Sequence, residues 1–178
     1  MTLETRFKQV QKYTGIDGGG CAGTGESLHI VGLATPEWTK VELRNEGLSV
    51  TITLGLWKSC VVSKCITISK LSELGRRGAL SQIKACEAMA ILGMLAGGAA
   101  LLLAVVKVIM MVMDKEHPKP LGLGALVCSI VSLALIVTCV VIWFVGVQQG
   151  GEAGYSLGLS IVGAILVPIG GVLSFISR

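Results

Sequence analysis

Three long apolar segments in the second half of the chain limit what it can fold into. They cover residues 88–113, 121–147 and 155–176, and each exceeds the roughly 20 residues that a helix needs to cross about 30 Å of hydrocarbon. Only 15% of the residues are charged, against about a quarter in a typical soluble domain. Helices buried in a large soluble core are the alternative, but the chain has no polar domain to cover them. The sequence therefore predicts a multi-pass membrane protein with three clear spans.

The links between these spans predict their orientation. Residues 114–120 contain Lys115 and Lys119, whereas residues 148–154 contain no Lys or Arg. Short basic links stay in the cytoplasm, so the first link is expected inside and the second outside. Alternation then places residues 28–84 outside, although that long segment is itself basic, and it places the N-terminus outside as well. An outer aromatic belt is expected at Trp143, Phe144 and Tyr155.

The N-terminal residues 1–27 are polar and then rich in glycine. Such a composition buries too little apolar surface to offset its ordering entropy, so we expect a flexible segment. A phosphate-binding loop would need a Lys-Ser or Lys-Thr after the glycines, which the sequence lacks. The apolar run at 28–34 is too short to span a bilayer.

Strand patterns follow between residues 48 and 68. Residues 48–54 alternate apolar and polar side chains with the period of two that marks a half-buried strand. Residues 57–62 and 64–68 predict two further short strands across a turn at Val62 and Ser63. The three domains expected are therefore a flexible segment at 1–27, a β-rich extracellular segment at 28–84, and a helical bundle at 85–178.

Two cysteines, Cys60 and Cys65, lie on opposite sides of the predicted turn. If the segment is extracellular, we expect them to form a disulfide. A zinc site is the alternative and needs about four ligands, but His29 and His117 are far away in the sequence.

The chain contains no motif typical of an enzyme. No Ser-His-Asp set, His-Glu-x-x-His motif or pair of intramembrane carboxylates occurs. Lys107, the one strong charge well inside a span, is expected to snorkel to the cytoplasmic interface. The glycines of the spans are expected to let helices approach closely inside the bundle. We therefore expect no catalytic residues, metal, cofactor or small-molecule substrate, and no nucleic-acid partner.

The combination of Trp38, Gly55-Leu56-Trp57, Cys60 and Cys65 resembles the pattern of the claudin and peripheral myelin protein superfamily. The resemblance implies a left-handed four-helix bundle with a small antiparallel extracellular sheet. It also implies that Trp38, Gly55, Leu56 and Trp57 anchor that sheet to the bundle, and that Cys60 and Cys65 form its disulfide. The chain departs from the family in a shorter spacing between the cysteines. It also departs in the first span, which should precede Trp38 but is represented only by residues 28–34.

The resemblance implies a structural or adhesive protein of cell–cell junctions in the plasma membrane. Its expected partners are the lipid bilayer and other claudin-like chains in the same or the opposing membrane, with a paracellular barrier or pore as the outcome. An auxiliary subunit that modulates a channel or receptor is the alternative. If a pore forms, Lys58 and Lys64 beside the hairpin are the candidate charges, and they predict a preference for anions.

Overall fold

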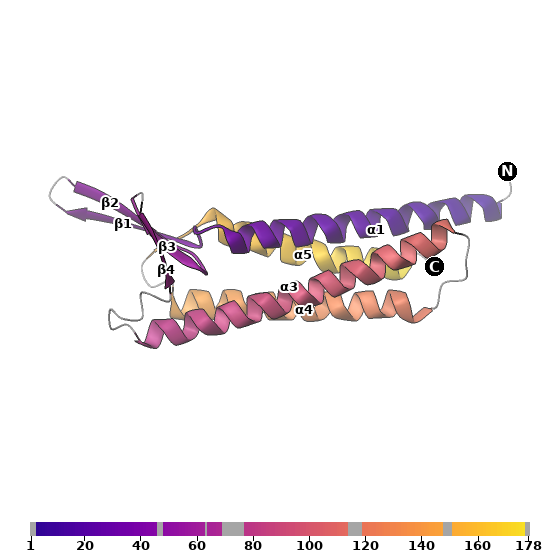
Figure 1. The fold of residues 1–178 in the computed structure, drawn as a ribbon. Helices are drawn as coiled ribbons and strands as arrows, with labels where there is room; N and C mark the ends of the chain where they lie inside the picture. The colour runs from indigo at the N-terminus through magenta and orange to yellow at the C-terminus, as the bar shows by residue number, and fades with distance from the viewer. Residues whose placement is uncertain are drawn as a thin grey trace.

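The computed structural model describes residues 3–45, 48–62, 64–68, 77–113, 119–147 and 151–176. In these residues a bundle of helices carries a small sheet at one end (Figure 1). The helices are α1 (Leu3–Ala34), α3 (Arg77–Val112), α4 (Lys119–Gly146) and α5 (Tyr155–Ile176). The strands are β1 (Thr39–Asn45), β2 (Leu48–Leu54), β3 (Lys58–Val61), β4 (Lys64–Thr67) and β5 (Glu152–Ala153). The predicted fold class, a membrane helical bundle with a small antiparallel sheet, is confirmed.

A heptad spacing of buried residues explains the bundle. Steps of three and four residues separate the buried positions of α3, which are Ile83, Cys86, Ala90, Gly93, Gly97, Ala100, Ala104 and Lys107. The same steps separate those of α4, which are Gly122, Ala125, Ser129, Ser132, Ile136, Cys139 and Trp143. A mean step of 3.5 residues keeps one narrow face toward the partner helices and favours a left-handed crossing.

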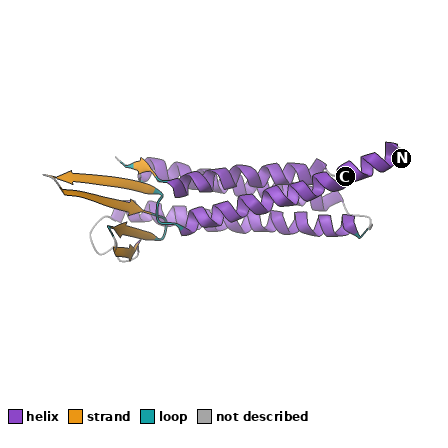
Figure 2. Cartoon of the chain, turned by 90° about the horizontal axis from the view of Figure 1, so that it is seen from above, coloured by secondary structure: helices purple, strands orange, loops and turns teal. Residues whose placement is uncertain are grey.

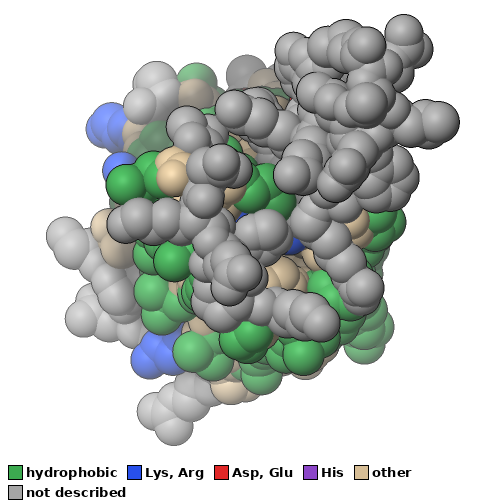
Figure 3. All heavy atoms as spheres, turned by 90° about the vertical axis from the view of Figure 1, so that its right-hand side faces the viewer, with side chains coloured by type: hydrophobic (Ala, Val, Ile, Leu, Met, Phe, Trp, Pro, Cys, Tyr) green, Lys and Arg blue, Asp and Glu red, His purple; other side chains and the backbone are tan. Residues whose placement is uncertain are grey.

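The three predicted spans each lie along one helix, although α3 begins eleven residues before the predicted start at residue 88. The segments long and apolar enough to cross a membrane in the described part of the chain are Ser81–Met111, Pro120–Gly146 and Tyr155–Ile176. Large apolar side chains such as Leu102 and Val145 point outward, with 67% and 74% of their surface exposed. Hydrophobic side chains also cover much of the described flanks when the bundle is viewed end-on (Figure 3). A surface of this kind suits lipid rather than water.

The N-terminal segment differs from the expectation of a flexible stretch before a short apolar remnant. It forms α1, a helix of 32 residues that packs chiefly along α5. Gly18, Gly25 and Gly32, spaced by seven residues, are buried on one face of this helix. Their weak helix propensity is overridden because the missing side chains allow close helix packing. The glycines that suggested a flexible segment therefore allow a close contact between α1 and α5.

The fourth helix also changes the expected position of the N-terminus. The start of α1 and the end of α5 lie at the same end of the bundle, which we call the terminal end (Figures 1 and 2). The sheet lies at the opposite end, which we call the sheet end. The expectation that the two termini lie on opposite sides is wrong, because it counted three long helices where the described residues form four.

The sheet is antiparallel with the strand order β4-β3-β2-β1-β5. The predicted strand at 48–54 is confirmed as β2, and the predicted hairpin is β3 and β4 with Val62 at its turn in a left-handed conformation, φ 57°. The short strand β5, which the sequence pattern did not predict, pairs with β1 through Thr39 and Ala153. Because β5 belongs to the link between α4 and α5, this pairing places that link at the sheet end, on the same side as the rest of the sheet.

Candidate functional site

The junction between the sheet and the bundle is built around two tryptophans. Trp38 precedes β1 and is fully buried, and its Nε1 donates a hydrogen bond to the carbonyl of Gly32 near the end of α1, at 2.9 Å. Its ring meets Trp143 of α4 edge-on, with centroids 5.0 Å apart and an interplanar angle of 61°. Trp143 Nε1 in turn donates to Thr39 Oγ1 at 2.9 Å. Both buried N–H groups are thus satisfied, and the contacts join α1, β1 and α4.

The Gly55-Leu56 turn between β2 and β3 completes this junction. A Cβ on Gly55 would lie 2.5 Å from Pro36 Cα, so only glycine allows this approach of the two backbones. Leu56 is fully buried in the cluster that also contains Trp38 and Trp143. Trp57 is only partly buried and packs against the edge of that cluster. The structure therefore brings together the four residues of the predicted anchor, with Trp38 and Leu56 at its centre and Trp57 at its periphery.

Sequence reasoning missed the role of Trp143. It assigned this residue to an outer aromatic belt at the membrane interface, but the ring is fully buried inside the bundle, and this assignment is wrong. The available signal was the heptad spacing, since Trp143 lies seven residues after the buried Ile136 and four after the buried Cys139. Phe144 and Tyr155, by contrast, are exposed as a belt would require.

The disulfide between Cys60 and Cys65 is present. The two residues lie directly opposite each other on β3 and β4, so the bond ties the end strand of the sheet to its neighbour. Cys60 is buried and Cys65 is exposed.

The two lysines of the hairpin are both exposed, but the structure does not bring them together. Lys58 pairs with Thr67 at one end of the hairpin, and Lys64 pairs with Val61 at the other end, beside the turn. Because side chains alternate between the faces of a strand, Lys58 shares a face with the disulfide and Lys64 lies on the opposite face. They are therefore separate charges rather than one basic cluster.

The tip of the hairpin is an exposed surface of mixed character. Val61, Val62 and Ile66 expose 40%, 77% and 40% of their area beside Lys64. The strand β4 ends the sheet order, and its four residues are all exposed. We call Val61, Val62, Lys64 and Ile66 the hairpin tip.

The structure also places the charged side chain of Lys107, in α3, differently from the expectation. Lys107 does not snorkel outward, because 96% of its surface is buried and its Nζ donates to the carbonyl of Ser174. That carbonyl belongs to the last turn of α5, where the helix dipole favours a cation. Lys107 therefore fastens α3 to the end of α5.

The described residues include no group of three or more His, Cys, Asp or Glu side chains that could hold a metal ion. Cys86 and Cys139 are buried between α3 and α4, where Cys86 Sγ donates to the Cys139 carbonyl at 3.3 Å. The site thus consists of packing contacts at the anchor and an exposed hairpin tip.

The structure defines a class of membrane protein, namely a helical bundle that carries an antiparallel sheet at one end and holds it through buried tryptophans. The family model described as the PMP-22/EMP/MP20/Claudin family matches residues 24–174. The chain belongs to this family. A comparison with curated proteins gives no match.

Proposed function

We propose that this claudin-like membrane protein is a structural and adhesive component of cell–cell junctions in the plasma membrane. The observation that carries the proposal is the hairpin tip, because it exposes apolar side chains next to β4, the strand that ends the sheet order and leaves one edge unshared within the described residues. An end strand offers backbone groups to a second chain. The expected partners are other claudin-like chains in the same or the opposing membrane.

The anchor is what would make the sheet an effective contact surface. Trp38, Gly55, Leu56 and Trp57 join the sheet to the bundle over the buried cluster described above. A surface that is held rigidly loses less conformational freedom when it binds. We therefore assign these four residues to positioning the hairpin rather than to contacting the partner.

A cell-contact experiment tests the adhesive function. Cells that lack junctional strands would express the full chain or Val62→Asp, which places a charge at the most exposed apolar residue of the hairpin tip. The unsubstituted chain should concentrate at contacts between expressing cells, and Val62→Asp should remain at the free surface. Equal distribution of both chains over contacting and free membrane would contradict the proposal.

A paracellular pathway beside the hairpin tip would favour anions. Residues 38–84 contain eight basic and three acidic side chains, and a positive field along a narrow path raises the local anion concentration. Lys64 is placed at the tip, whereas Lys58 lies at the far end of the hairpin on the other face. Lys58→Glu is therefore a matched control for Lys64→Glu, since both substitutions change the net charge equally.

Dilution potentials across an epithelial layer that expresses each chain decide between pore and barrier. The unsubstituted chain should shift the dilution potential in the direction of higher anion permeability. Lys64→Glu should reverse this shift, and Lys58→Glu should retain most of the shift. Unchanged potentials for all three chains would refute the pore and leave the adhesive function to the cell-contact experiment.

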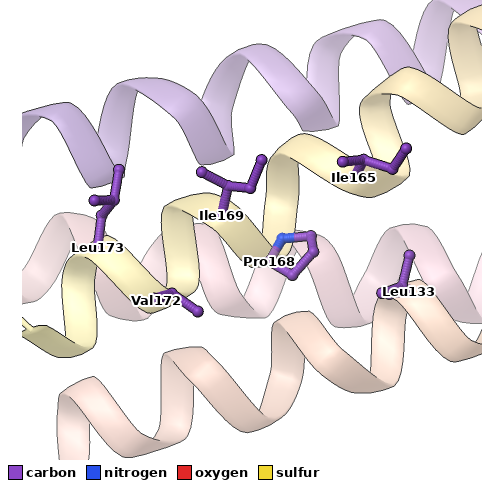
Figure 4. A pocket seen from close by; sticks show the side chains of 6 residues that line it. All are labelled: Leu133, Ile165, Pro168, Ile169, Val172 and Leu173. Carbon is purple, nitrogen blue, oxygen red and sulfur yellow. The ribbon is translucent and has the colours of Figure 1, made fainter.

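One feature favours the alternative of an auxiliary subunit. An apolar groove with a volume of about 350 Å³ runs between α4 and α5 (Figure 4). It is lined by Leu133 of α4 and by Ile165, Pro168, Ile169, Val172 and Leu173 of α5. A membrane-spanning helix of a channel or receptor in this groove would use it as a docking face. Co-purification of a channel with the chain, abolished by Ile169→Trp, would favour this alternative.

A further inference from the structure

Two buried cysteines face each other across α3 and α4. Cys86 of α3 and Cys139 of α4 expose 0% and 1% of their surface, and both are free thiols in the structure. Cys86 Sγ donates to the Cys139 carbonyl at 3.3 Å, and the two thiol side chains are also in hydrogen-bond contact with each other. The fold therefore brings together two thiols that lie 53 residues apart in the sequence.

The register of the two helices explains this contact. The helices α3 and α4 run side by side in opposite directions (Figure 1). One heptad further from the sheet end, Ser132 Oγ of α4 donates to the Gly93 carbonyl of α3 at 2.8 Å. At both levels a side chain of one helix reaches the backbone of the other, so Cys86 and Cys139 occupy equivalent positions along one close seam. The packing of the whole helix pair thus holds the two thiols opposite each other.

The pair lies near the sheet end of the bundle. Cys86 is five residues inside the apolar segment that begins at Ser81, and Cys139 is seven residues before the end of the segment that ends at Gly146. These intervals are about 7 Å and about 10 Å along the helices. The sheet at this end contains the disulfide between Cys60 and Cys65, and disulfides form on the oxidising side of a membrane. The two buried thiols are therefore close to the side on which oxidation takes place.

We propose that Cys86 and Cys139 form a second disulfide, which links α3 to α4 beneath the sheet. The bond forms by thiol–disulfide exchange with a disulfide-bonded oxidant of the secretory compartment. One thiolate attacks the oxidant and gives a mixed disulfide, and the other thiolate then displaces the second sulfur of the oxidant. The cysteine pair gives up two electrons and two protons, and the oxidant takes them up and leaves as two thiols.

The burial of the pair sets the order of events. Both thiols are covered once α3 has packed against α4, so the exchange takes place while the two helices are still separating and closing. The structure shows the same pair with both thiols in the reduced form.

The second disulfide would strengthen the support of the anchor. Both cysteines belong to the buried cluster that contains Trp38, Leu56 and Trp143. A bond between them joins the two helices below the sheet. It also connects residues 53 apart, whereas the first disulfide connects residues 5 apart, and a longer closed loop restricts the unfolded chain more strongly.

Peptide mapping of the full chain tests the bond. Protein labelled at the cell surface is solubilised in denaturant that contains N-ethylmaleimide, so that each free thiol is alkylated, and is then digested without reductant. A peptide pair joined through Cys86 and Cys139 should be recovered from most of the surface protein and should separate on reduction. Cys21 and Cys128, which are free and only partly buried, should carry the alkyl group.

Two variants provide the controls. Cys128→Ser removes a thiol of α4 outside the pair and should leave the joined peptides unchanged. Cys139→Ser should leave Cys86 alkylated. If Cys139→Ser does not reach the cell surface, the map of the unsubstituted chain still decides. Alkylation of both Cys86 and Cys139 in the surface protein would overturn the proposal, and so would a bond from either of them to Cys21 or Cys128.

Discussion

Gly25 is the most direct test of the contact between α1 and α5. A Cβ at this position would lie 2.8 Å from the Gly163 carbonyl oxygen, 2.9 Å from Leu166 Cβ and 2.9 Å from the Val167 nitrogen. Two of these three atoms belong to the backbone, so the clash cannot be relieved by rotating a side chain. Gly25→Ala must therefore move α1 away from α5.

The expected change in the free energy of unfolding of Gly25→Ala follows from two opposing effects. Overpacking of a close contact costs about 1–3 kcal/mol. Replacing glycine by alanine within a helix stabilises by about 0.5–1 kcal/mol. The net effect of Gly25→Ala is a destabilisation of up to about 2.5 kcal/mol. The helix-propensity contribution can be measured separately with Gly20→Ala, because a Cβ on Gly20 meets nothing within 4 Å.

The assay is reversible unfolding in mixed micelles, followed by circular dichroism, for the two variants and the unsubstituted chain. Gly20→Ala should be slightly more stable than the unsubstituted chain, and Gly25→Ala should be less stable than Gly20→Ala by about 1–3 kcal/mol. Equal stability of the two variants would show that α1 and α5 do not meet at Gly25, and the explanation of the glycine spacing would then be wrong.

Two further predictions concern the sheet end. Non-reducing peptide mapping should recover Cys60 joined to Cys65, and replacing both by serine should lower the free energy of unfolding by about 2 kcal/mol, since the closed loop is short; free thiols at both positions would contradict this. Trp38→Ala should destabilise by about 3–5 kcal/mol and reduce delivery to the cell surface in a thermal-stability and surface-labelling assay. Trp57→Ala, at a partly buried position, should have the smaller effect, and the reverse order would show that Trp57 is the main anchor.

The sequence predicted those elements whose pattern is local. The alternation over residues 48–54 was sufficient to define β2, and the lengths of the three apolar runs were sufficient to define α3, α4 and α5. The hairpin pairing of Cys60 and Cys65 also followed from local spacing. In each case the neighbours that determine the structure lie within a few residues.

The elements that sequence reasoning missed depend on distant partners. Glycine lowers helix propensity wherever it occurs, so α1 could be predicted only by matching Gly18, Gly25 and Gly32 with the equally spaced Gly163 and Gly170 of α5. Once α1 was taken as flexible, Glu26 and His29 could not be recognised as interior groups. The same reasoning explains the error at Lys107, whose partner is a carbonyl of another helix.

The pairing of α1 with α5 has a consequence for how the protein is made. The helix α1 is not among the segments apolar enough to cross a membrane by composition, and it carries Glu26 and His29 toward the interior. Its main partner α5 leaves the ribosome only after α3 and α4. Without α5, the glycine face of α1, which packs on Gly163 and Gly170, has no packed surface to cover it. Stable integration of α1 must therefore follow the synthesis of α5, and chains truncated before Tyr155 should leave α1 accessible to chaperones and to the quality-control machinery of the cell.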